Sequence, residues 1–209
     1  MTTLLQLNTS LFSNQGSSSK LADEFVAGWA AANPGAEVIV RDLAKHPVPH
    51  LTGERFQAFL AKPEDRTAAQ RAEAEVSDVL VNEIQRADAI VIGLPMYNFG
   101  VPSTLKAYFD HIARAGITFR YTANGPEGLL KEKKVYVFAT RGGLYAGTAR
   151  DTQTQYVRDF LAFLGMSDVE FVYAEGMAMG DVVRTPALEK ATIAAHQLAR
   201  ARPELRVAA

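Results

Sequence analysis

The chain has 209 residues, 48% of them hydrophobic, which suits one well-filled core and a single domain over residues 1–209. Its 22 basic and 23 acidic residues leave a net charge of −1, so no strong field favours nucleic acid or an anionic membrane as a partner. The chain has no cysteine, which excludes disulfides, iron–sulfur ligation, thiolate zinc sites and a catalytic thiol, so any redox chemistry must come from a bound cofactor.

The first half of the chain alternates apolar runs with segments of helical spacing. Residues 4–8 predict a strand and 17–29 a helix, and the run EVIV at 37–40 predicts a second strand. The segment 42–63 contains prolines and a glycine and is expected to be partly irregular. An amphipathic helix is predicted over 68–86. Its apolar face is expected to consist of Ala72, Val76, Val79, Leu80 and Ile84.

The second half repeats this alternation. ADAIVIGL at 87–94 is apolar almost throughout, as in a strand that is covered on both faces. A helix is predicted over 102–115, with proline in its first turn. The remaining elements are strands at 134–139 and 169–173, helices at 152–164 and 186–200, and a tail at 201–209 that is expected to fray.

Strands that alternate with helices predict an α/β fold in which helices cover both faces of a parallel sheet. Right-handed crossovers leave few topologies, and five strands with a phosphate-type loop after the first suggest a doubly wound sheet of order 2-1-3-4-5. Ligands of such sheets bind beyond the carboxyl ends of the strands. The loops 9–19, 95–101 and 140–147 are therefore expected to form the site.

The first loop is rich in serine and leads into a helix. A helix N-terminus offers unpaired N–H groups to a phosphate, and Ser10, Ser17 and Ser18 are the candidates to join them. The alternative is that the serines merely cap the helix. The loop has neither G-x-x-x-x-G-K-[ST] nor G-x-G-x-x-G, and no acidic residue ends the first strand. A Walker site, a Rossmann site and a receiver-type magnesium site are thus unsupported.

The second loop, PMYNFG at 95–100, has aromatic and amide side chains and no charge. Met96, Tyr97 and Phe99 can pack against an aromatic ring, and the Asn98 amide can bond to its heteroatoms. The helix that begins near Pro102 directs its positive end toward the same place. This pattern suits an isoalloxazine, although a turn whose aromatics complete the core explains it equally well.

The third loop contains Gly142 and Gly143, which let the backbone approach a ligand edge but also suit a tight turn. Arg141 could meet a carbonyl or phosphate, or be a solvated surface residue. Phe119 and Tyr121 could roof an aromatic substrate or pack in an interface or core.

Three of the four histidines point to neither a metal site nor an acid–base catalyst. His46 and His50 flank a Pro-Val-Pro segment without a third ligand nearby, so no metal site is expected. His111 is expected to lie on a helix surface or in packing rather than to act as a base.

Five stretches carry a resemblance to a known family: RDLAKHPVPHLTGE at 41–54, PMYNF at 95–99, ARAGITFRYTANGPEGL at 113–129, RGG at 141–143 and FVYAEG at 171–176. With these, nearly the whole chain resembles the FMN-dependent NADH azoreductases, within the flavodoxin-like NAD(P)H:quinone oxidoreductase family.

The resemblance implies a flavodoxin-like fold, a homodimer with active sites at the subunit interface, and a set of site residues. Asn98 is expected to be catalytic, and Phe99, Phe119 and Tyr121 are expected to contact the substrate. Gly16 and Thr140 stand where the family is expected to have serines. The residues expected to bind FMN are Ser10, Gly16, Ser17 and Ser18 at the phosphate, Pro95, Met96, Tyr97, Asn98 and Phe99 at one ring edge, and Thr140, Arg141, Gly142 and Gly143 at the other.

The activity that follows is a ping-pong, two-electron hydride transfer from NADH, or NADPH, through FMN to quinones and azo compounds. The alternatives are a flavodoxin-type electron carrier and a non-catalytic FMN-binding sensor. Carriers tend to be smaller and strongly acidic, unlike this nearly neutral chain. The N-terminus lacks a basic region and a long apolar segment, so a soluble cytoplasmic protein is expected.

Overall fold

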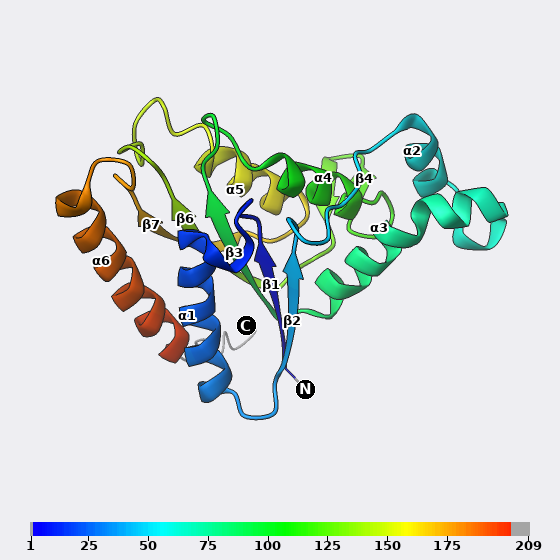
Figure 1. Ribbon diagram of the computed structural model, residues 1–209. Coiled ribbons are helices and arrows are strands. Elements are labelled where there is room, and N and C mark those ends of the chain that lie inside the picture. The colour runs from blue at the N-terminus through cyan, green and yellow to red at the C-terminus, as the bar shows by residue number, and fades with distance from the viewer. Residues whose placement is uncertain (1, 202–209) are drawn as a thin grey trace.

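The computed structural model of the protein describes residues 2–201, so most of the tail that is expected to fray lies outside the described residues. Five parallel strands form the central sheet, in the order β2-β1-β3-β6-β7. Counted within the sheet this order is 2-1-3-4-5, which confirms the predicted doubly wound topology (Figure 1). The strands are β1 (Thr3–Asn8), β2 (Glu37–Asp42), β3 (Ala89–Pro95), β6 (Lys134–Thr140) and β7 (Asp168–Ala174).

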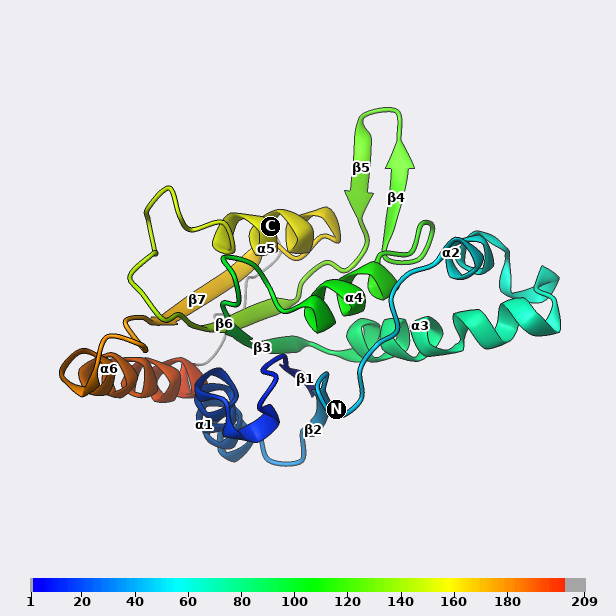
Figure 2. The ribbon, with the colours of Figure 1, turned by 45° about the horizontal axis from the view of Figure 1, so that its top comes forward.

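Helices cover both faces of the sheet, and Figure 2 shows the two layers on its opposite sides. On one face α1 (Ser17–Ala32) and α6 (Asp181–Arg200) pack through Phe25, Trp29 and Ala195. On the other face α3 (Ala68–Arg86), α4 (Ser103–Ile112) and α5 (Thr154–Phe163) enclose the larger apolar cluster. The strands β1 and β3 are buried along their whole length because they lie between these layers.

The buried face of α3 differs from the predicted one. Val76 and Val79 are 40% and 46% exposed, and Ala72 is exposed too. The face that packs inward consists of Ala74, Ser77, Leu80, Val81 and Ile84. Ser77 Oγ donates a hydrogen bond of 2.6 Å to the backbone oxygen of His111 in α4. Because residues 74 and 77 are small, α4 can pack closely against α3. The hydrogen bond from Ser77 fixes the rotation of α3 about its own axis, which the apolar spacing alone left ambiguous.

The segment expected to be partly irregular has no helix or strand over 43–52, as predicted, whereas the last helix starts earlier than predicted. The segment 42–66 contains α2 (Gly53–Leu60), which Thr52 caps by accepting a bond from the Arg55 N–H, and a short 3-10 turn, η2 (Pro63–Asp65). The last helix begins at Asp181, five residues before the predicted start at Pro186. A proline there leaves the Val182 carbonyl without its helical donor, and Val182 is 90% exposed, so water can satisfy that oxygen.

A hairpin projects from the body beyond α4 and α5 (Figure 2). Its strands, β4 (Phe119–Thr122) and β5 (Gly125–Gly128), pair antiparallel. A Cβ added to Gly128 would lie 2.0 Å from the nitrogen of Gly165, so glycine is required where the hairpin base meets the turn after α5. Among the described residues no helix is long and apolar enough to cross a membrane.

Candidate functional site

A cavity of about 190 Å³ lies at the carboxyl ends of the central strands. The three predicted loops meet there, together with Met177 from the loop after β7. The first of these loops contributes Phe12, which precedes a short 3-10 turn, η1 (Ser13–Gln15). The lining residues are Ser10, Phe12, Gly16, Ser17, Ser18, Pro95, Met96, Tyr97, Thr140, Arg141, Gly142 and Met177. The sequence thus predicted all of the lining except Phe12 and Met177. Of the predicted cofactor residues, Asn98, Phe99 and Gly143 lie outside this lining.

One end of the cavity is the start of α1, where no side chain caps the helix. The capping interpretation of the serines is therefore wrong, and the first N–H groups of α1 remain free to bind an anion. Ser18 Oγ is buried without a hydrogen-bond partner. A buried hydroxyl without a partner is costly, so a ligand that accepts its hydrogen bond would be favoured here.

Two glycines allow this end of the cavity to form. A Cβ on Gly16 would lie 2.2 Å from Ser10 Oγ, so the turn before α1 has no room for a side chain. A Cβ on Gly93, in β3, would lie 2.9 Å from the Ser18 carbonyl oxygen. Glycine at 93 therefore lets the start of α1 sit directly against the end of β3.

The second loop is a two-residue turn. The N–H of Tyr97 donates to the Gly100 oxygen (3.2 Å), the Gly100 N–H donates back to Tyr97 (2.9 Å), and Asn98 and Phe99 have φ of 50° and 62°. Positive φ at both central positions is the signature of a type I′ turn. Phe99 is 51% exposed and meets Tyr145 edge-on at 5.6 Å. The alternative in which the loop aromatics complete the core is thus wrong for Phe99.

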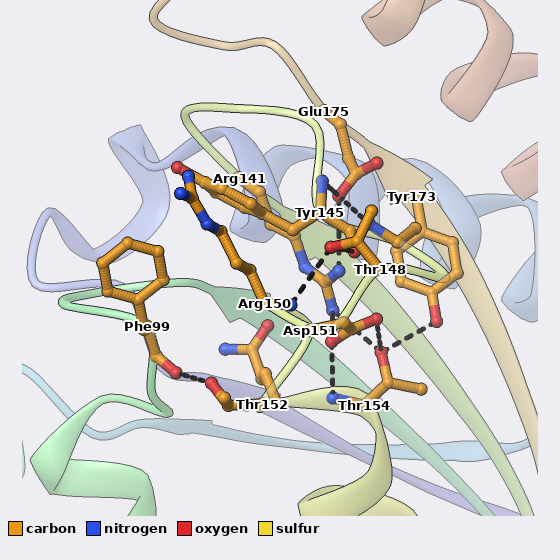
Figure 3. A network of polar contacts seen from close by, with 12 residues as sticks. Phe99, Arg141, Tyr145, Thr148, Arg150, Asp151, Thr152, Thr154, Tyr173 and Glu175 are labelled. Atoms are coloured by element: carbon orange, nitrogen blue, oxygen red, sulfur yellow. Dashed lines mark hydrogen bonds and ion pairs between the residues drawn. The ribbon is translucent and has the colours of Figure 1, made fainter.

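The third loop is organised by Arg141, whose side chain is buried, so the surface interpretation is wrong. One terminal nitrogen donates to Asp151 Oδ1 (2.9 Å) and Thr154 Oγ1 (2.8 Å), and the other lies 3.3 Å from Glu175 Oε1. Figure 3 shows this network, with the guanidinium between the two carboxylates. Because the guanidinium is held internally, Arg141 does not offer it freely to a phosphate or carbonyl in the cavity.

The two carboxylates of this network hold backbone as well as Arg141. Glu175 Oε1 also accepts the N–H groups of Tyr145 (2.9 Å) and Ala146 (2.8 Å). Burial acts to raise the pKa of Asp151, but hydrogen bonds from Arg141 and Thr154 outweigh it, and the pKa lies below its usual value. Both carboxylates therefore act as hydrogen-bond acceptors that fix the loop after β6, and sequence reasoning singled out neither of them.

The remaining predicted residues lie elsewhere. Phe119 is 7% exposed and packs against Phe163 at 4.4 Å, which makes it part of the core below the hairpin. Tyr121 is 76% exposed at the hairpin surface. Neither lines the cavity of its own chain.

His111 is fully buried, so the helix-surface interpretation is wrong and the packing interpretation is confirmed. Its ring lies edge-on to Phe59 at 5.4 Å. Burial lowers the pKa of its imidazole. Within residues 2–201 no three His, Cys, Asp or Glu side chains gather as a metal site would require.

The chain is similar to proteins of one family. A family model described as the flavodoxin-like fold matches residues 2–199. The FMN-dependent NADH:quinone oxidoreductase of Cellvibrio japonicus is 58% identical over 180 residues, covering 86% of this chain and 90% of that protein. FMN-dependent NADH:quinone oxidoreductase 6 of Burkholderia lata is 54% identical over 188 residues, covering 90% and 95%.

Two solved structures of azoreductases have the same fold as this chain. Azoreductase AzrA superposes with a TM-score of 0.86 at 29% identity, covering 95% of this chain and 99% of that one. An FMN-dependent NADH-azoreductase from Bacillus anthracis, solved in complex with FMN, has a TM-score of 0.83 at 26% identity and covers 95% and 100%.

Proposed function

The chain belongs to the family with the flavodoxin-like fold, and from this premise we propose that it is an FMN-dependent NADH:quinone oxidoreductase that also reduces azo compounds. The observation that carries the proposal is the cavity at the strand ends, where the uncapped start of α1 and the unpartnered Ser18 hydroxyl face an uncharged loop. One end of the cavity suits a phosphate and the other a flat ring, which is the chemistry of FMN.

The residues present fit this cofactor. Free N–H groups at the start of α1, with the hydroxyls of Ser10, Ser17 and Ser18, would hold the phosphate. Gly16 keeps the turn small enough for a phosphate to approach. The segments 95–99 and 140–143 would flank the ring from two sides. Bound FMN supplies the redox chemistry, since it can accept a hydride from NADH and transfer it to a quinone or azo compound.

The protein itself would orient the flavin ring and the substrate and would exclude water from the site. Asn98 and Phe99 occupy the two central positions of the type I′ turn, are both exposed, and directly follow Tyr97, which lines the cavity. We assign Asn98 the catalytic role of hydrogen-bonding the ring during hydride transfer, and we assign Phe99 to substrate stacking. Since the chemistry belongs to the cofactor, no side-chain acid or base is required in this loop.

A homodimer is part of the proposal. Tyr121 lies outside the cavity of its own chain and is highly exposed, and Phe56 and Leu60 of α2 are also exposed, by 49% and 56%. A second copy would bury these apolar groups and could bring the hairpin residues Phe119 and Tyr121 near a neighbouring site. Sedimentation velocity tests this, because a wild-type protein that remains monomeric at micromolar concentration would contradict it. The cytoplasmic location stays a prediction.

The proposed activity is tested by the anaerobic visible spectrum of the protein with FMN, before and after NADH, followed by addition of benzoquinone. We expect protein-bound flavin bands that bleach with NADH, return with quinone and do so over many turnovers. Flavin that binds but does not bleach would support the carrier or sensor alternative instead. If no flavin binds, the cavity has another ligand.

The role of Asn98 is tested by Asn98→Gly rather than by alanine, because glycine adopts the positive φ without strain. We expect the rate of flavin reduction at saturating NADH to fall about tenfold, as for the loss of one hydrogen bond of about 1.4 kcal/mol. The dissociation constant of FMN should change much less. An unchanged reduction rate would remove Asn98 from the mechanism.

A further inference from the structure

A buried glutamine outside the proposed FMN site holds the loop that carries Asn98. Gln153, which precedes α5, is fully buried, and its Nε2 donates hydrogen bonds to the carbonyl oxygens of Pro95 (3.0 Å) and Gly100 (3.2 Å). These two oxygens lie on either side of the turn. Because both are acceptors, the NH₂ of the amide has to face them.

The turn needs such support because its conformation is unfavourable for its residues. Asn98 and Phe99 both have positive φ, and two-residue turns of this type prefer glycine at the second position. Phenylalanine occupies that position here. The Thr152 hydroxyl adds a third external tie, since it donates to the carbonyl oxygen of Phe99.

Gln153 carries a local cost that packing alone does not explain. Its Oε1 is buried without a hydrogen-bond partner. A methionine or leucine could fill the same space without an unsatisfied oxygen. The two bonds to the loop are the hydrogen bonds that the side chain makes within the described structure. The amide oxygen of Gln153 thus makes no hydrogen bond, while its NH₂ group makes two. A buried amide kept at this cost indicates that the NH₂ group serves to position the loop.

Residues 151–154 also hold the loop after β6, which forms another part of the cavity lining. Asp151 and Thr154, on either side of Thr152 and Gln153, bind the guanidinium of Arg141. Residues 151–154 therefore bridge the loop after β3 and the loop after β6. This bridge adds to the direct contact between the two segments, in which the Met96 N–H donates to the Thr140 carbonyl oxygen (2.9 Å).

We propose that Gln153 is a positioning residue that holds the turn at Asn98 and Phe99 in its ring-binding conformation before any cofactor arrives. The link to FMN rests on the proposed function, whereas the preformed turn does not. Preformed walls lower the ordering cost of binding and fix the groups that contact the reacting atoms. Gln153 itself touches neither the ring nor the substrate in this proposal.

The first test uses the protein without cofactor. Gln153→Met keeps the side-chain length and removes the donor, and Gln155→Met, at an exposed position in the first turn of α5, is the matched control. We expect the Tyr97 and Gly100 amides to exchange with solvent about tenfold faster in Gln153→Met, as for the loss of a hydrogen bond or two. Amides of β1 and α1 should be unchanged, as should all amides in the control.

A surface variant keeps the test decisive if Gln153→Met folds poorly. Thr152→Val, at an exposed position, should accelerate exchange of the same loop amides by a smaller factor. Wild-type exchange of these amides in both variants would overturn the proposal. Equal acceleration in β1 and in the loop would also overturn it, because that pattern reports general destabilisation.

The second test measures FMN. The dissociation constant, measured by quenching of flavin fluorescence, should rise about tenfold in Gln153→Met and remain at the wild-type value in Gln155→Met. The rate of flavin reduction at saturating NADH should fall, with little change in the KM for NADH. If the loop amides of Gln153→Met exchange faster but its FMN affinity and rate of flavin reduction are unchanged, Gln153 does not position the loop for the flavin ring, and that part of the proposal is overturned. If the wild-type protein binds no FMN, the proposed function fails while the amide exchange still decides the role of Gln153.

Discussion

Because the hydroxyl of Ser18 has no hydrogen-bond partner, Ser18→Ala is expected to weaken FMN binding without lowering the stability of the apoprotein. Ser18 is 1% exposed, its Oγ has no hydrogen-bond partner, and it lines the cavity at the start of α1. Ser18→Ala removes a buried polar atom that has no hydrogen-bond partner within the described structure. We therefore expect the free energy of unfolding of the apoprotein to stay constant or to rise by about 1 kcal/mol.

The same substitution should weaken FMN binding. A hydroxyl that donates to a charged phosphate contributes about 1.5–3 kcal/mol. At 1.4 kcal/mol per factor of ten, the dissociation constant should rise about 10- to 100-fold. Urea unfolding of the apoprotein and fluorescence titration with FMN measure the two effects. The stability that excess FMN adds should shrink accordingly in the variant.

Ser19 provides the matched control. Its hydroxyl is also buried without a partner, but it does not line the cavity. Ser19→Ala should show a similar change in apoprotein stability and an unchanged affinity for FMN. The reasoning is refuted if Ser18→Ala binds FMN as tightly as the wild type does, or if both substitutions weaken binding equally.

Three further predictions concern the parts around the site. Phe119→Ala should lower the free energy of unfolding by about 3–5 kcal/mol because the ring is packed against Phe163. Tyr121→Ala should change it by less than about 0.5 kcal/mol because that side chain is exposed. Similar midpoints of urea unfolding for the two variants would contradict this. Arg141→Met leaves Asp151 and Glu175 without their cation and should cost about 3–5 kcal/mol in the same assay, and a loss below about 1 kcal/mol would contradict the network. Burial lowers the pKa of His111, so the unfolded state binds more protons than the folded one, and stability should fall as the pH drops below about 6.5 toward the folded-state pKa. Urea midpoints between pH 7.5 and 5.5 should fall less in His111→Gln than in the wild type, and equal slopes would contradict this assignment.

The fold and the position of the site followed from local patterns in the chain. Apolar runs and helical spacing are properties of neighbouring residues, so the five strands of the sheet and most of its covering helices could be predicted from them. The order of the strands then followed from the handedness of crossovers. Because the carboxyl ends of parallel strands meet at one edge, the three loops of the cavity could be predicted from the order of the strands.

Some predictions failed where two local patterns competed. On α3 both the stripe with Val76 and Val79 and the stripe with Ala74 and Ser77 have helical spacing. Close packing against α4 selected the second stripe, and this choice depends on the neighbour rather than on α3 itself. The expectation for Phe119 was similarly open, and the base of the hairpin settled it as a core residue.

The sequence by itself determined the α/β architecture, the family and the three loops that line the cavity, because each of these depends on order and spacing along the chain. Only the tertiary structure decided what holds the loops after β3 and β6 in place. The partners of Arg141 and of Gln153 include Glu175 and Pro95, which are 34 and 58 residues away in the sequence. Such pairings arise only when folding brings different loops together, since buried charges and amides must then satisfy one another within a shared, water-poor space.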